Sequence, residues 1–210
     1  MTNPTSGPGA AAPDPSASSP SASSPADQVR RTLEARALAE DGRLAEAQRL
    51  LDAVAAEQPE DVEVRTRLAL ERAWLLLEND DEASAKDAAI FAREAAQLSS
   101  SGLDQTPLGG LHIEALRLLA RLPEQPSEQV AMLKKAVALA SSSKDATAQA
   151  WRARLLIDLG RAQFNNGKPG AARLKLNEAI TTAIELNDLA ARDEAAELVT
   201  WLEQHAEVDG

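Results

Sequence analysis

The chain has 210 residues, of which 44% are hydrophobic and 2% aromatic, and its 33 acidic and 22 basic residues give a net charge of −11. It contains no cysteine, which excludes a disulfide framework and a thiolate zinc site. The acidic balance argues against a nucleic-acid partner or an anionic membrane surface as partner, since both attract cationic proteins.

The apolar residues are mostly Ala and Leu, which favour helices, and no segment shows the alternation of a strand. We therefore expect an all-α protein. No apolar run has the length of a membrane span, and the first residues lack the pattern of a secretion signal. These features predict a cytoplasmic protein.

Residues 1–27 form the first predicted unit. Six prolines stand there among Ala, Ser and Gly, and Asp14 and Asp27 are the only charged residues. Such a composition buries too little apolar area to offset the entropy of ordering the chain. We predict a disordered tail over 1–27 and one helical repeat domain over 28–210.

Helical patterns separated by short breaks fill the predicted domain. Most of the breaks contain Gly, Pro, Asn or Asp, which end helices or begin turns. The predicted helices are 28–41, 44–57, 61–78, 83–99, 108–122, 127–142, 146–166, 170–186 and 188–205. Short connections of this kind predict successive antiparallel hairpins.

Two of these hairpins share a pattern of residues at a separation of 125 positions. A glycine is predicted to end each first helix in a left-handed conformation. Five residues later, an alanine places a small side chain where the two helices cross, and a leucine fills the space beyond it. The matched pairs are Ala35 with Gly160, Gly42 with Gly167, Ala47 with Ala172, and Leu51 with Leu176.

This pattern resembles the tetratricopeptide repeat, a helix–turn–helix unit with a Leu-Gly pair, an aromatic residue, alanines and a proline at fixed places. Leu159-Gly160, Phe164, Ala172 and Ala179 carry the resemblance in the later hairpin, and Pro59 follows the first one. The resemblance implies an α-solenoid of about four antiparallel hairpins with a C-terminal capping helix. It also implies a concave face lined by the first helix of each hairpin.

The segment Gly167-Lys168-Pro169-Gly170 could also suggest a phosphate-binding loop. That loop requires a preceding strand and a Ser or Thr after the lysine, whereas Pro169 follows Lys168. Gly42 takes the matching place in the first hairpin without any lysine nearby. We interpret the segment as a turn between two helices.

No constellation of residues typical of catalysis is found in the sequence. His112 and His205 lack the Glu-x-x-His spacing that places two metal ligands on one helix face. No pattern of a serine nucleophile or of an oxyanion site is present. We expect no catalytic residue, no metal site and no cofactor.

The three tryptophans, Trp74, Trp151 and Trp201, are expected to fill gaps in a core made of small side chains. Trp151 is the predicted exception, because Arg152 and Arg154 flank it. We expect this tryptophan to be the one that faces a ligand.

Charge is unevenly distributed toward the end of the chain. Residues 150–176 hold six basic residues and one acidic residue, whereas residues 188–210 hold one basic and seven acidic residues. The two segments could attract each other, or their charges could simply be solvated. Alternatively, the basic segment forms a cationic groove for an acidic peptide or a terminal carboxylate. The sequence leaves these interpretations open.

The resemblance places the expected partner-binding residues on the concave face. We expect a non-enzymatic interaction module that binds a protein or peptide, an acidic one if the basic segment is used. The alternatives are a self-associating structural protein, which would form a homo-oligomer, and a regulatory domain for a small acidic ligand. The expected binding residues are Arg154, Ile157, Arg161, Phe164, Asn165 and Arg36.

Overall fold

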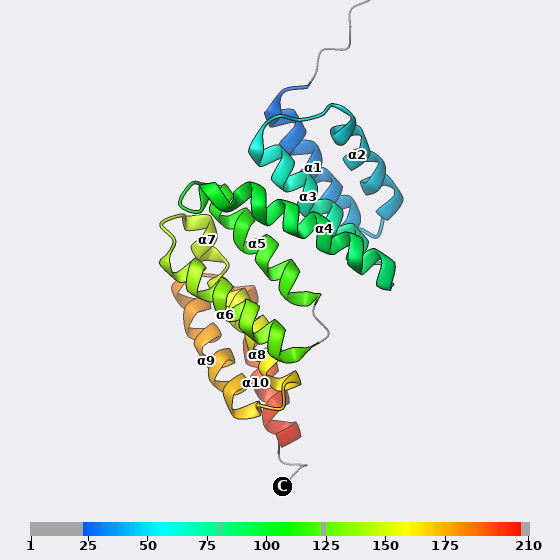
Figure 1. The fold of residues 1–210 in the computed structure, drawn as a ribbon. Coiled ribbons are helices and arrows are strands. Elements are labelled where there is room, and N and C mark those ends of the chain that lie inside the picture. Colours follow the sequence, from blue (N-terminus) through cyan, green and yellow to red (C-terminus); the bar gives the residue numbers. More distant parts are fainter. Residues whose placement is uncertain (1–22, 80, 123–124, 207–210) are drawn as a thin grey trace, which may run out of the picture.

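The computed structural model describes residues 23–79, 81–122 and 125–206, and these residues contain helices and no strand. Figure 1 shows the helices as an elongated stack, with α1 to α4 at one end and α8 to α10 at the other. The α-helices are α1 (Pro25–Glu40), α2 (Leu44–Ala56), α3 (Val62–Leu77), α4 (Glu82–Ser99), α5 (Leu108–Arg121), α6 (Pro126–Ser142), α7 (Ala146–Ala150), α8 (Arg152–Asn165), α9 (Pro169–Glu185) and α10 (Leu189–Ala206), with a 3-10 turn η1 (Ser100–Gly102) after α4.

The predicted helix over 146–166 is wrong in one respect, because the chain turns at Trp151 and forms α7 and α8 instead. The start of α7 is held by residues distant in sequence. Asp145 is 2% exposed and accepts hydrogen bonds from the hydroxyl of Thr106 and the backbone N–H of Gly110, both from the α5 region. These bonds hold the short α7 against α5.

The first helix begins inside the segment predicted as a tail. Ser24 caps α1 by accepting the backbone N–H of Asp27 at 3.2 Å, and Pro25 occupies the first turn, where its missing N–H has no consequence. The ordered helix therefore starts three residues before the predicted boundary. The remainder of the predicted tail, 1–22, lies outside the described residues.

The predicted left-handed helix ends are confirmed. Gly42 has φ +78° and Gly167 has φ +69°, a conformation that costs glycine no steric strain. Behind each glycine, a backbone N–H reaches back to the carbonyl of the preceding helix, Arg43 to Leu38 at 2.8 Å and Lys168 to Gln163 at 2.9 Å. A bond of this kind at each glycine is typical of the Schellman motif, which ends the helix and turns the chain toward the next one.

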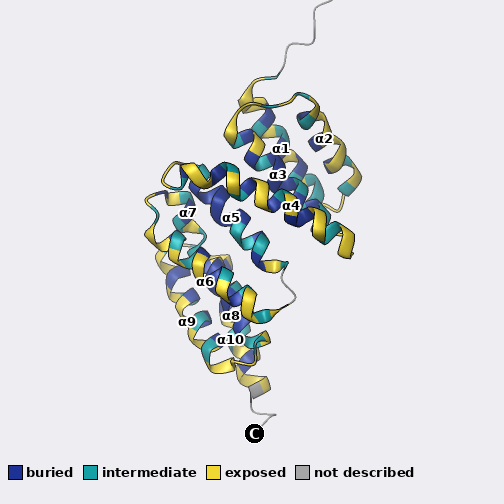
Figure 2. Ribbon diagram, viewed as in Figure 1, coloured by how far each residue is buried: buried dark blue, intermediate teal, exposed yellow. Residues whose placement is uncertain are grey.

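Successive helices pack as antiparallel pairs, α1 with α2, α3 with α4, α5 with α6, and α8 with α9. Neighbouring pairs join where the second helix of one pair packs on the next helix of the chain, α2 on α3, α4 on α5, α6 on α8 and α9 on α10, with further contacts of α1 on α3, α3 on α5 and α8 on α10. Figure 2 shows the buried residues between the helices and the exposed ones outside. The core is therefore a series of clusters along the stack rather than one centre.

Small side chains set the distance between paired helices, as the sequence pattern predicts. Ala47 and Ala172 are both fully buried at their crossings, and Leu51 and Leu176 are buried beside them. At Gly160, an added Cβ would lie 2.8 Å from Cγ of Leu176. Helix α9 can approach α8 this closely because position 160 has no side chain.

The repeat extends beyond the hairpin to the next helix. Helix α10 packs on α8 and α9 in the way that α3 packs on α1 and α2. Equivalent residues of α3 and α10 are 127 positions apart in the sequence. Asp61 and Asp188 cap the two helices in the same way, accepting the backbone N–H of Val64 and Ala191, each at 3.1 Å. Three buried residues of α3, Val64, Leu68 and Leu75, correspond to three of α10, Ala191, Ala195 and Leu202. We call these two groups of helices the N-terminal unit (α1–α3) and the C-terminal unit (α8–α10).

The two third helices differ on the side that faces away from their own hairpin. In α3 this side is apolar and packs against α4 and α5. In α10 it is exposed and mostly polar. The positions in α3 are Ala69, Leu70, Ala73, Leu76 and Leu77, and those in α10 are Ala196, Glu197, Thr200, Glu203 and Gln204. The C-terminal unit therefore ends in a helix whose outer side offers little apolar surface to a further hairpin.

Candidate functional site

Each unit encloses a hollow between its first and third helices, and the second helix forms the floor. The N-terminal hollow has a volume of about 250 Å³ and the C-terminal hollow about 330 Å³. The N-terminal hollow is lined by Ala35, Arg36, Ala39, Glu40, Leu51, Glu71, Trp74, Leu75 and Glu78. The C-terminal hollow is lined by Gly160, Arg161, Phe164, Asn165, Leu176, Leu198, Trp201 and Leu202.

The two hollows are built from equivalent positions. Arg36 of α1 corresponds to Arg161 of α8, and both stand at the edge of their hollow. Trp74 of α3 corresponds to Trp201 of α10, and each forms a wall. The same construction at both ends of the stack indicates that the hollows follow from the repeat itself.

The linings differ in polarity, however. The C-terminal hollow has apolar or uncharged side chains where the N-terminal hollow has carboxylates, and an aromatic ring where the N-terminal hollow has a methyl group. The pairs are Ala39 with Phe164, Glu40 with Asn165, and Glu71 with Leu198.

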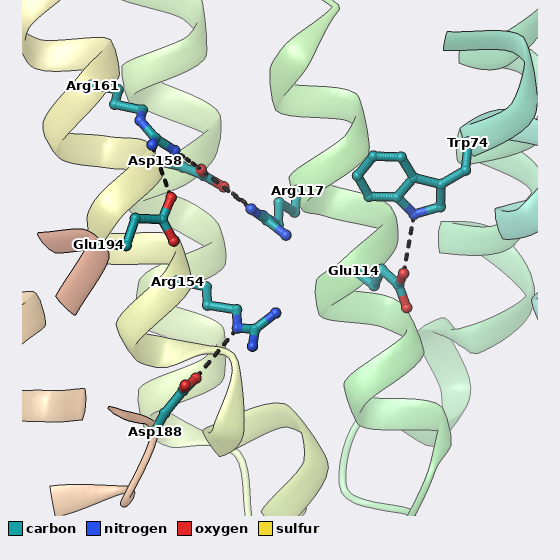
Figure 3. A network of polar contacts seen from close by, with 8 residues as sticks. All are labelled: Trp74, Glu114, Arg117, Arg154, Asp158, Arg161, Asp188 and Glu194. Carbon is teal, nitrogen blue, oxygen red and sulfur yellow. Dashed lines mark hydrogen bonds and ion pairs between the residues drawn. The ribbon is translucent and has the colours of Figure 1, made fainter. Parts of the chain in front are cut away.

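A buried charge cluster forms one side of the N-terminal hollow. The guanidinium of Arg36 binds the carboxylates of Glu71 and Glu114, each at 2.7 Å, and both glutamates are buried. The indole N–H of Trp74 donates to Glu114 at 3.1 Å, as Figure 3 shows. The guanidinium of Arg121 lies 5.1 Å from the Trp74 ring centre. Helices α1, α3 and α5 are thus connected through one arginine.

Burial changes the ionisation of this cluster. Burial raises the pKa of Glu71 to about 7, although Arg36 opposes the shift. Burial also acts to lower the pKa of Arg36, but the charges of Glu114 and Glu71 prevail and raise it. Burial, together with the nearby carboxylate of Glu114, therefore favours the protonated form of Glu71.

Aromatic rings line the C-terminal hollow. Phe164 and Trp201 meet edge to face, with ring centres 5.0 Å apart, and the ring of His205 stacks on that of Trp201 with ring centres 4.3 Å apart. Trp201 is 41% exposed, so the expectation that it fills the core is wrong. Trp151 is half-buried, and the guanidinium groups of Arg117 and Arg154 lie over its ring.

The arginines of the basic segment contact carboxylates of this chain. Arg154 pairs with Asp188 at 3.3 Å and Arg161 with Glu194 at 2.8 Å. Figure 3 shows these pairs beside Asp158, which contacts both Arg161 and Arg117. A further pair, Arg173 with Glu203 at 3.5 Å, links α9 to α10. The attraction between the basic hairpin and the acidic last helix is therefore present in the structure.

The structure brings together only part of the predicted binding set. Arg161, Phe164 and Asn165 line the C-terminal hollow, and Arg36 lines the N-terminal one. Arg154 is exposed but lines neither. Ile157 is 1% exposed in the core between α8, α9 and α10, so the expectation that it contacts a partner is wrong. A helix face defined by spacing alone includes residues that the neighbouring helices cover.

The sequence did contain a signal for the tryptophan walls that the predicted set omits. Trp74 and Trp201 each lie 13 residues after the aspartate that caps their helix, Asp61 and Asp188. Equal spacing from equivalent caps places both rings at the same height and on the same side of their helices.

No known protein family, curated protein or solved structure matches this chain. Within residues 23–79, 81–122 and 125–206, no group of three or more His, Asp or Glu side chains could hold a metal ion. None of the helices in these ranges is both long and apolar enough to cross a membrane.

Proposed function

We propose that the protein is a non-enzymatic interaction module of the tetratricopeptide type, which binds an extended or helical segment of a partner protein through its two hollows. One observation carries the proposal: the same three-helix unit, with a tryptophan wall and an arginine at the edge, occurs at both ends of the stack. Side chains of one partner segment would enter the hollows, and the rigid helices between them would set the spacing.

The partially exposed aromatic surface supports this function. Trp201 and Phe164 present apolar area beside Arg161 and Asn165, a combination common at the energetic centre of protein interfaces. An acidic ligand is less favoured than the sequence suggested, because it would have to compete with Asp188 and Glu194 for the arginines. End-to-end self-association is also less favoured, because the outer side of α10 is mostly polar.

Trp201→Ala tests the proposal. Capture of partners from native lysate should be at least tenfold lower for this variant than for the wild-type protein, since a central aromatic residue contributes about 2 kcal/mol or more to binding. Ile184→Ala is the matched control, because Ile184 is 60% exposed on α9 and lines neither hollow. Equal capture by both variants, with unchanged melting temperatures, would refute a role for the C-terminal hollow.

A further inference from the structure

The N-terminal hollow has the shape and charge to hold a single basic side chain. We propose that it binds the lysine or arginine side chain of the partner segment. This inference rests on the proposed function and adds the chemistry that one end of the partner must carry. It also reverses the expectation of an acidic partner, which was based on the basic segment of the sequence.

The charges of the lining favour a cation. Three glutamates, Glu40, Glu71 and Glu78, line the hollow with one arginine, Arg36, and because Glu71 is paired with this arginine, the negative charge offered to a ligand is that of Glu40 and Glu78. That arginine is shared with Glu114, so its charge is divided between two carboxylates. Glu40 and Glu78 are exposed and have no ion pair within 4.0 Å among the described residues. A cation entering the hollow would gain partners without displacing an internal one.

The apolar part of the lining matches the rest of such a side chain. Ala35, Ala39, Leu51 and Leu75 form an apolar surface beside the carboxylates. Lysine and arginine side chains bury an aliphatic stem along apolar surface while the charged head remains near polar groups. A volume of about 250 Å³ is large enough to accommodate such a side chain.

The C-terminal hollow shows that the repeat can be built without these carboxylates. The position of Glu71 is a leucine there, Leu198, and that of Glu40 is an asparagine, Asn165. A leucine would also avoid the cost of a buried carboxylate, which is expressed in the raised pKa of Glu71. The acidic lining is thus a property of one hollow and independent of the scaffold that both share.

The experiment uses the indole N–H signals of the three tryptophans in the ¹⁵N-labelled full chain. Nα-acetyl-lysine methylamide is titrated at low salt, and the probe with an acetylated side-chain amine serves as the uncharged control. We expect a saturable shift of the Trp74 signal with the lysine probe and a much smaller one with its acetylated form. Trp201, in the equivalent hollow without carboxylates, is the internal reference.

Two double variants separate the hollow from the general negative charge of the protein. The double variant Glu40→Gln, Glu78→Gln should lower the affinity for the lysine probe about threefold per carboxylate, as expected for exposed charge pairs. Glu128→Gln with Glu185→Gln makes the same change in net charge at exposed sites away from the hollow and should leave the affinity unchanged. Added salt should weaken the wild-type interaction.

Three results would overturn the inference: equal shifts of Trp74 and Trp201, equal shifts with both probes, or equal weakening by both double variants. Each outcome is distinct from failure of the proposed function, because Trp201→Ala tests capture through the other hollow. If capture depends on Trp201 but the lysine probe does not shift the Trp74 signal, the protein is an interaction module whose partner places no basic side chain in the N-terminal hollow.

Discussion

Gln163 illustrates how one residue can depart from the pattern around it. It occupies in α8 the place that Leu38 has in α1, and it is 6% exposed. Its buried side-chain Oε1 has no hydrogen-bond partner among the residues that the structure describes. A buried acceptor without a partner costs about 1–3 kcal/mol relative to a satisfied or apolar group.

We therefore predict that Gln163→Leu raises the free energy of unfolding by about 1 kcal/mol. In urea unfolding, this change appears as a higher midpoint concentration. Leucine has a similar volume and already fills the equivalent place in α1. Gln204→Leu, at an exposed position of α10, is the control and should change the midpoint very little. A lower midpoint for Gln163→Leu would show that the amide has a structural role.

Glu71 makes stability depend on pH at the opposite end of the stack. Its carboxyl group, which faces Arg36, Arg67 and Glu114, has a pKa of about 7 in the folded protein against an ordinary 4.5. Between these values the folded chain holds a proton that the unfolded chain has lost. This contribution to stability is complete below pH 4.5 and is lost as the pH rises through 7.

Glu71→Gln removes this titration while keeping the shape of the side chain. The difference in the free energy of unfolding, variant minus wild type, should increase by on the order of 1–3 kcal/mol from pH 5 to pH 8, because only the wild type loses stability in this range. Urea unfolding at both pH values measures this difference. Glu128→Gln, at an exposed position of α6, is the control. A constant difference across this range would contradict a raised pKa.

At the scale of elements, the distance between paired helices is set by the alanine at their crossing. Ala172 is 0% exposed where α9 meets α8, so a larger side chain must push the two helices apart. Ala172→Leu should lower the free energy of unfolding by about 1–3 kcal/mol. Lys168→Leu adds apolar bulk in the exposed turn and should have a far smaller effect. Similar effects at both positions would be incompatible with the observed crossing.

Ion pairs connect α8 to α10 and can be tested by exchanging the charges. Arg161→Glu places a carboxylate against Glu194, and it should lower the free energy of unfolding by up to about 1 kcal/mol, since the pair is half exposed. Glu194→Arg in the same chain should restore most of the loss. If the double variant is as unstable as the single one, the contact with Asp158 matters more than the pair across the helices.

At the scale of the whole molecule, stability should decrease toward the ends of the stack. Among the described residues, helix α5 packs against α3, α4, α6 and α7, whereas α2 packs mainly against α1 and α3. In arrays of this kind each unit is stabilised mainly by its neighbours. Hydrogen exchange should therefore be slower in α5 than in α2.

Leu51→Ala should accelerate exchange in α1 and α2 by removing a fully buried side chain from the N-terminal unit, a change that typically costs 2–5 kcal/mol. Exchange in α9 should remain as in the wild type, because the two units share no core cluster. Uniform acceleration across the chain would indicate a single cooperative unit instead.

The sequence predicted the helices well because their ends are determined locally. Gly42, Gly167 and the capping aspartates are visible in the chain, and they act within a few residues. The short α7 before Trp151 was not predicted, and its capping residue, Asp145, is held by contacts 35 and 39 residues away in the chain. The candidate site was predicted only in part for a similar reason. Spacing placed Arg161, Phe164 and Asn165 together, but the burial of Ile157 is decided by α9 and α10.

The polar outer side of α10 determines how such a chain can be lengthened. Helix α3 continues into another hairpin because its outer side is apolar, whereas α10 has Glu197, Thr200, Glu203 and Gln204 at four of the five equivalent outer positions. Replacing these four with the α3 residues would convert a terminus into a junction. Molecules altered in this way should join through the exposed end, in pairs or in filaments. The same four polar residues thus limit the apolar surface that the outer side of α10 offers, and an engineer could replace them to append a further hairpin.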